Sequence, residues 1–339
     1  MYDNKLIDWT INKANTEFKD DIAIMIESDR NYLMEDRELR FVNKFVCDKP
    51  ELIGLARTFI IGECSYDLMQ YSWEHMERHA QVDYYCTLLA DSKLVYYRTE
   101  ADKQRFEALQ QQFYANLSDK RFMMGRALEW LNEAMEIYKN MMFEDEMSAV
   151  RKAAGYIADD LSWAVAACNQ TYFKSWRSDE ALASLRELPA GFVDCYHEIV
   201  NAKTGDALKR LAQQMIAMTR TFVAARKPAK PKDESAHYWL KEWYEEGAYY
   251  FRRIYYYCDQ NDAMVSFMLS CAMQAEFDDI ARGYGIEDLN VLAYFDADDL
   301  MGFKARMQAA VARIVKRIAD DGYVLDAYAD IDAFIRENP

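Results

Sequence analysis

Two carboxylates in the first fifth of the chain have the residue type and the setting to hold a metal ion. Glu38 stands directly before an apolar stretch, residues 39–46, and Asp67 lies within another, residues 65–71. Carboxylates that project from neighbouring strands of a mixed sheet can bind Mg²⁺, because this cation takes oxygen ligands and often shares them with substrate phosphates. The chain has 57 acidic residues, so the alternative is that both carboxylates are solvated strand ends.

A small mixed sheet must position these carboxylates. Short apolar runs bounded by turn residues predict its strands at residues 22–26, 39–46, 57–61, 65–71 and 93–97. The pair at 57–61 and 65–71 is a predicted hairpin. An amphipathic helix over residues 6–18 precedes the sheet, and another helix begins near Trp73.

From Thr99 onward the apolar residues recur with a period of 3.6, which predicts a helical bundle. The pattern breaks at residues 224–232, where two prolines and several cationic residues predict a hinge. Further helices are expected at 238–258, 262–282, 297–320 and 332–337. The predicted class is α+β, with an α/β domain at 1–99, a helical bundle at 100–226 and a C-terminal helical region at 233–339.

Composition excludes several classes of protein. Only 11 glycines and 5 prolines occur, too few for an all-β sandwich or barrel. The formal charge of −16 disfavours general nucleic-acid binding, and no apolar run is long enough for a membrane helix. Seven scattered cysteines without CxxC spacing indicate reduced thiols, and with an N-terminus unlike a secretory signal they predict a cytoplasmic protein.

The layout resembles nucleotidyltransferases of the DNA polymerase β superfamily, close to the kanamycin-nucleotidyltransferase-like bacterial proteins. The stretch at 58–74 resembles the hairpin that carries a metal-site carboxylate and the helix start that follows it. The stretch at 89–98 with Arg105 and Phe106 resembles the last strand and the exit helix, and 150–157 with 169–174 resembles the bundle helices. The resemblance spans residues 20 to 225.

The resemblance implies a function and assigns roles to four residues. A protein of this family transfers a nucleoside monophosphate from an NTP to a hydroxyl-bearing acceptor, with Mg²⁺ as cofactor and with the acceptor between the sheet and the bundle. Glu38 and Asp67 would hold the metal, and Ser28 would contact the phosphates. Arg40 stands where the family has a second acid, and Glu27 stands where it has a glycine.

These two departures leave two functions open. Glu27 would repel phosphate, and loss of one of three carboxylates would weaken a two-metal site. Arg40 either pairs with Glu38 or Asp67 as a structural ion pair, or contacts a bound phosphate directly. The protein is therefore either a working nucleotidyltransferase or a catalytically degenerate nucleotidyltransferase-like protein, a pseudoenzyme that binds a nucleotide or a partner.

Other motifs favour structural roles. His75 and His79 have the i, i+4 spacing of metal ligands, but we expect both to be solvated on a helix surface. Gly155 within a helical stripe predicts close helix packing. The aromatic block at 249–257 predicts core and interface contacts, and the surplus of aromatic residues suggests a homodimer.

Overall fold

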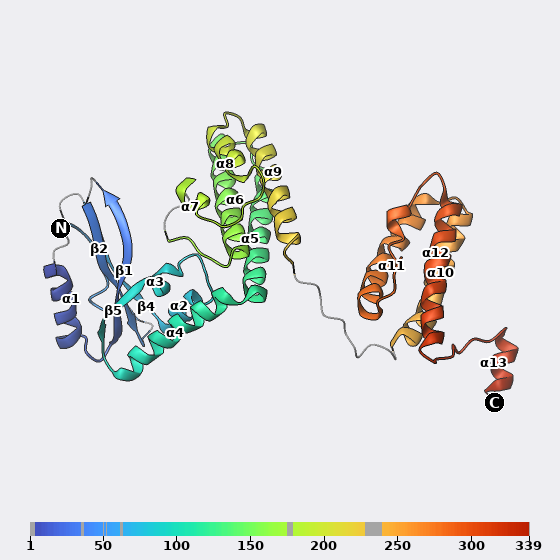
Figure 1. Cartoon of the computed structure of the whole chain (residues 1–339), viewed down its shortest axis with the longest axis horizontal. Coiled ribbons are helices and arrows are strands. Elements are labelled where there is room, and N and C mark those ends of the chain that lie inside the picture. Colours follow the sequence, from blue (N-terminus) through green and yellow to red (C-terminus); the bar gives the residue numbers. More distant parts are fainter. Residues whose placement is uncertain are drawn as a thin grey trace. The chain divides into compact units, whose positions relative to one another are not determined.

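The computed structural model describes residues 4–34, 37–49, 51, 53–61, 64–174, 179–227 and 239–338; the side chains of residues 4, 28–43, 64 and 65 are outside this description. The chain forms two compact units, residues 1–228 and 229–339, each described here by itself. Figure 1 shows the elements of both units. The α+β class predicted from the sequence is confirmed, because a mixed sheet at the start of the chain is followed by helices.

The first unit begins with a helix and a five-stranded sheet. In chain order these elements are α1 (Asn4–Thr16), β1 (Ile22–Met34), β2 (Arg37–Cys47), β3 (Arg57–Ile61), β4 (Cys64–Tyr71), α2 (Trp73–His79), α3 (Thr87–Ala90) and β5 (Ser92–Tyr97). The strand order is β3-β4-β2-β1-β5. Strands β2 and β4 are parallel, and the other neighbouring pairs are antiparallel. The predicted hairpin of β3 with β4 is confirmed.

Helices cover both faces of the sheet. Successive side chains on a strand point to opposite faces, so neighbouring strand residues join different buried clusters. Phe45 and Cys47 join a buried cluster with Ala14 of α1 on one face. Val46 joins the buried cluster that includes Trp73 of α2 on the other face. The apolar run at 22–26 is almost fully buried, as expected for a strand covered on both faces.

Helices make up the rest of the first unit (Figure 1). They are α4 (Glu100–Ser118), α5 (Lys120–Met141), α6 (Met147–Cys168), α7 (Asp179–Ala183), α8 (Phe192–Asn201) and α9 (Gly205–Ala224). Helix α6 is the central element, because residues 161–167 are buried without a break. Its apolar face shares one buried cluster with the sheet residues Ile24 and Val46.

The second unit is helical in its described part. It contains α10 (Trp239–Asp259), α11 (Ala263–Tyr284), the short 3₁₀ helix η1 (Leu292–Tyr294), α12 (Leu300–Asp320) and α13 (Ile331–Glu337). The aromatic block divides between core and surface: Phe251 is buried, whereas Tyr249 and Tyr256 are more than half exposed. None of the helices described in either unit has the length and apolarity needed to cross a membrane.

The predicted hinge after residue 224 agrees with the end of α9 at Ala224 and with a boundary between units at Pro228. Most of the hinge, residues 228–238, lies outside the described residues. The predicted division between residues 99 and 100 stays a prediction, because one buried cluster joins the sheet to the bundle.

Candidate functional site

Asp67 is the predicted metal ligand whose side chain the structure describes. It lies on β4, opposite Thr58 of the edge strand β3. The Thr58 hydroxyl donates a hydrogen bond to Asp67 Oδ1 over 3.1 Å. The carboxylate is partly exposed and so offers oxygen atoms to a ligand or a cation.

The other predicted site residues lie on the two neighbouring strands. Ser28 on β1 is opposite Phe41 of β2 and Ser92 of β5, while Glu38 on β2 is opposite Leu33 of β1. Arg40 also belongs to β2. The side chains of Ser28, Glu38 and Arg40 lie outside the described residues. At the level of strands, β4, β2 and β1 are adjacent, so the structure brings together the elements that carry the predicted site.

The strand register does not bring Glu38 level with Asp67. The parallel ladder between β2 and β4 pairs Lys44 with Met69. Asp67 is two residues before Met69, whereas Glu38 is six before Lys44; at about 3.3 Å per residue, roughly 13 Å of strand separates the two levels. The described side chains supply one carboxylate here and include no cluster of three metal-ligating residues. Because the Glu38 side chain lies outside the described residues, the two-carboxylate magnesium site stays a prediction, and the strand register alone sets Glu38 and Asp67 at different levels.

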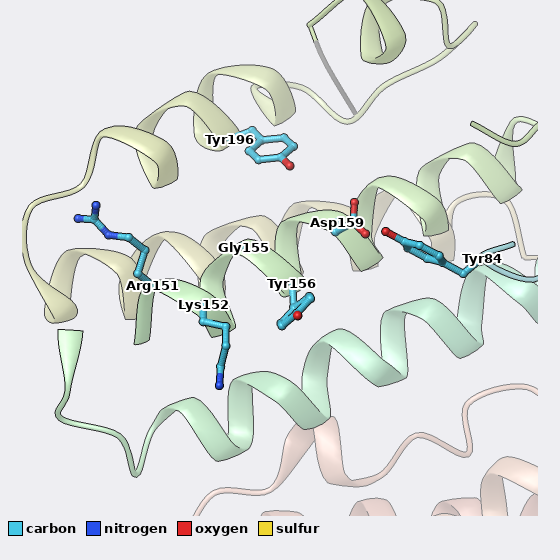
Figure 2. A pocket seen from close by; sticks show the side chains of 7 residues that line it. All are labelled: Tyr84, Arg151, Lys152, Gly155, Tyr156, Asp159 and Tyr196. Carbon is cyan, nitrogen blue, oxygen red and sulfur yellow. The ribbon is translucent and has the colours of Figure 1, made fainter. Parts of the chain in front are cut away.

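A cleft on the exposed side of α6 offers a different set of chemical groups (Figure 2). We call it the α6 cleft; its volume is about 350 Å³. The segment between α2 and α3, α6 and α8 supply its lining residues, which are Tyr84, Arg151, Lys152, Gly155, Tyr156, Asp159 and Tyr196. The volume is within the usual range for small-molecule sites.

The two ends of the α6 cleft carry different chemical groups. Figure 2 shows Arg151 at one end and Asp159 with Tyr84 at the other. The Arg151 guanidinium donates one hydrogen bond to the carbonyl of Ala202, over 2.7 Å, which holds α6 to the start of the segment before α9. An arginine has five N–H donors, so this bond leaves others for an anionic ligand.

Gly155 opens the middle of the α6 cleft. A Cβ atom built at this position would meet no atom within 4 Å, and the residue is exposed. The prediction that Gly155 marks close helix packing is therefore wrong: its missing side chain leaves open space beside Tyr156, whose side chain is 59% exposed. A flat ligand can approach the helix backbone at this point.

An aromatic layer fixes the inner wall of the α6 cleft. The Tyr84 ring lies 5.6 Å from the Trp163 ring, and Trp163 stacks on Trp130 at 5.7 Å between centroids. Because these three rings pack against one another, Tyr84 has a defined position before any ligand binds.

The two histidines of α2 differ from the prediction. His79 is buried at 4% exposure, and its Nδ1 lies 2.9 Å and 3.0 Å from the two carboxylate oxygens of Asp83. His75 is partly exposed and bonds to Ser72. The expectation of two solvated histidines is wrong for His79, because the helix turns that face toward the core.

Sequence reasoning missed the α6 cleft as a site. The signal was present: Arg151, Gly155 and Asp159 follow one another at intervals of four on a helix whose other face is apolar, which places them on one exposed face. Tyr84 and Tyr196 come from distant parts of the chain, and no local pattern indicates them. No protein-family model matches the chain, and no curated protein matches its sequence at a significant level.

Proposed function

We propose that this protein is a nucleotidyltransferase-like nucleotide-binding protein that holds its ligand in the α6 cleft. One observation carries the proposal: two cationic side chains, three tyrosines and an open glycine line a cavity of about 350 Å³. The cleft lies where Tyr84, from the segment between α2 and α3, meets α6 and α8 of the helical bundle.

The cationic end of the cleft suits phosphate groups. Arg151 retains free donors beyond its bond to Ala202, and Lys152 is exposed on the next position of α6. Guanidinium and ammonium groups both bind phosphate oxygens through charge-assisted hydrogen bonds. In a chain with a net charge of −16, this pair of cations gives the cleft groups that attract an anion.

The middle of the cleft and the end at Asp159 suit a nucleobase. Tyr156 presents an exposed ring beside the open space at Gly155, and a base can stack on such a ring. Asp159 lies two turns beyond Arg151, at about 12 Å along the helix axis. Its carboxylate could accept a hydrogen bond from an exocyclic amine of the base.

Calorimetric titration of the whole chain with ATP, GTP, CTP and UTP, with and without Mg²⁺, tests this function. We expect binding, and we expect Lys152→Gln to weaken it about three- to tenfold by removing one charge-assisted contact. Lys139→Gln is the matched control, since Lys139 is exposed on α5 and does not line the cleft. Absence of heat with every nucleotide at about millimolar protein would reject the proposal.

The transfer of a nucleoside monophosphate is a second candidate, favoured by the adjacency of β4, β2 and β1. In this reaction an acceptor hydroxyl loses its proton, attacks the α-phosphorus of an NTP and displaces pyrophosphate. Ser28 and Arg40 would contact phosphate. Asp67 would hold Mg²⁺ with a ligand other than Glu38, because Glu38 lies at a different level along the strands. If this site works, Asp67→Asn should abolish the Mg²⁺ dependence of nucleotide binding; an unchanged dependence would remove the second candidate.

The same proposal places the protein in the cytoplasm, where nucleotides are abundant and thiols stay reduced. The six cysteines whose side chains are described are all free thiols, in agreement with this setting. A homodimer also stays a prediction, to be tested by sedimentation of the whole chain.

A further inference from the structure

A second cavity of the first unit carries positive charge without any role in the proposed function. It lies where the start of α5, the end of α6, the segment before α8 and the end of α9 meet, and its volume is about 480 Å³. We call it the Arg226 cavity. Its lining includes Lys120, Cys168, Gln170, Arg186, Glu187 and Arg226.

Three cationic side chains and one carboxylate line the Arg226 cavity. Glu187 forms a close ion pair with Arg226, and its Oε1 lies 3.6 Å from Arg186 Nε. The hydrogen bond from Arg226 and the charges of both arginines hold the pKa of Glu187 below its ordinary value, so this carboxylate is ionised at neutral pH. Three positive charges against one negative leave a net charge of +2 on the lining.

Hydrogen bonds between elements fix the walls of the cavity. Asn169 donates to the carbonyl of Glu187 over 2.8 Å and accepts from its N–H over 2.9 Å. Gln170 donates to the carbonyl of Ser118 over 2.7 Å. Arg226 donates to the carbonyl of Phe222 over 2.9 Å and lies over the ring of that residue. The backbone walls and the Arg226 guanidinium are therefore held in place before a ligand arrives.

Gln170 adds a conformational observation. Its φ of +54° lies in the left-handed region, which a residue with a side chain rarely adopts. This backbone turn takes the chain away from the end of α6 and places Gln170 in the cavity lining. A left-handed residue directly after the C-cap is a common way for a helix to end, and here the N–H groups of Gln170 and Thr171 bond to the carbonyls of Ala167 and Ala166.

We propose that the Arg226 cavity binds a small phosphorylated molecule through its phosphate group. A phosphate dianion matches the net charge of +2, and planar guanidinium groups match its oxygen atoms. Arg186 and Lys120 are exposed lining residues that can donate to the ligand, while Glu187 keeps Arg226 in place. The remaining volume admits the organic part of a phosphate ester. This site is separate from the α6 cleft, and it stands or falls independently of the nucleotide proposal.

Cys168 provides a local probe of occupancy. Its thiol lines the cavity and is partly exposed, and burial raises its pKa to about 11. Alkylation by iodoacetamide at pH 8.5, followed by peptide mass spectrometry, reports access to the cavity. Cys271 of the second unit is also partly exposed and serves as the reference thiol in the same sample.

Inorganic phosphate and glucose 6-phosphate are the probes, with sodium chloride at equal ionic strength as the blank. If the dissociation constant is about 3 mM, about 10 mM phosphate leaves roughly a quarter of the sites open, and alkylation of Cys168 slows about fourfold. Protection by both probes assigns the site to phosphate esters, and protection by inorganic phosphate alone assigns it to the free anion. If neither probe slows alkylation relative to Cys271, the proposal is wrong.

Matched variants separate this site from the α6 cleft. The double variant Lys120→Gln and Arg186→Gln removes two exposed cations and should abolish protection of Cys168. Lys152→Gln, in the α6 cleft, should leave that protection unchanged. Equal protection in the double variant and in the parent protein would overturn the assignment of these cations to phosphate.

Discussion

His75 links the first turn of α2 to pH. Its Nδ1 accepts a hydrogen bond from the Ser72 N–H over 3.2 Å, so the imidazole is neutral in this arrangement. Burial, followed by the charges of Arg78 and His79, lowers the pKa of His75 below 6.5. The unfolded chain therefore binds more protons than the folded chain, and stability is lost as pH falls through 6.5.

We predict that His75→Gln removes this pH dependence of stability but keeps a side-chain acceptor for the Ser72 N–H. Ser72 is the N-cap residue of α2 and His75 is the third residue of the helix, where a glutamine side chain can also accept the hydrogen bond from the Ser72 N–H. Urea unfolding at pH 7.5 and pH 5.5 checks the prediction: the parent protein should lose more stability than the variant between the two values. An equal loss in both proteins would show that His75 does not carry the effect.

Asn169 is the side chain that joins the end of α6 to the segment before α8. It makes three hydrogen bonds, to the carbonyls of Val165 and Glu187 and from the Glu187 N–H. We predict that Asn169→Ala lowers the free energy of unfolding of the first unit by about 1–3 kcal/mol, because backbone groups lose their partners. Asn201→Ala is the control, since Asn201 is exposed and makes one bond; a change within about 0.5 kcal/mol is expected there by urea unfolding.

Individual side chains were the least predictable level of this molecule. The sequence around His79 reads as a polar helix surface, yet the residue is buried and paired with Asp83. The spacing of residues within one helix does not tell which face a neighbouring element covers. The α6 cleft was unpredictable for the same reason, because Tyr84 and Tyr196 approach α6 only through tertiary packing.

Helix α6 is the element on which the packing of the first unit most depends. Leu161 is fully buried and begins the longest buried run of the helix, residues 161–167. We predict that Leu161→Ala destabilises the first unit by about 2–5 kcal/mol, through lost apolar contacts and a residual cavity. Thermal unfolding followed by circular dichroism measures the loss.

We predict that Tyr156→Ala on the same helix lowers nucleotide affinity and leaves stability almost unchanged. The Tyr156 side chain is 59% exposed, so its removal should change stability by no more than about 0.5 kcal/mol. If its ring stacks on a nucleobase, nucleotide affinity should fall about fivefold or more, as judged by calorimetry. A variant with full affinity would exclude Tyr156 from the binding site.

Secondary structure was largely predictable where apolar periodicity was strong. The apolar run at 22–26 and the hairpin of β3 with β4 appear where they were expected, because burial selects their residue types. The register between strands was not predictable. Irregularities in the pairing of β1 with β2 shift the opposing residues between Ile26 and Tyr32. The level of Glu38 relative to Asp67 follows from the register of β2 with β4, which no local pattern indicates.

At the scale of the whole molecule, each compact unit has its own largest buried cluster, and the smaller cluster between the sheet and α1 belongs to the first unit. The first cluster joins sheet residues such as Ile24 to bundle residues such as Leu161. The second is made of residues from 240 onward, including Phe303, which is 1% exposed. Because residues that share a core unfold together, the sheet and the bundle should behave as one cooperative unit and the second unit as another.

Differential scanning calorimetry of the whole chain should therefore show two transitions. We predict that Ile24→Ala and Leu161→Ala lower the same transition, because both side chains are fully buried in the first cluster. A loss of about 3 kcal/mol corresponds to roughly 6–12 °C for a unit of this size. Phe303→Ala should lower only the other transition, by a larger shift, since the second unit is the smaller of the two. If Ile24→Ala and Leu161→Ala moved different transitions, the sheet would fold independently of the bundle, and the division of the chain at residue 99 predicted from its sequence would hold.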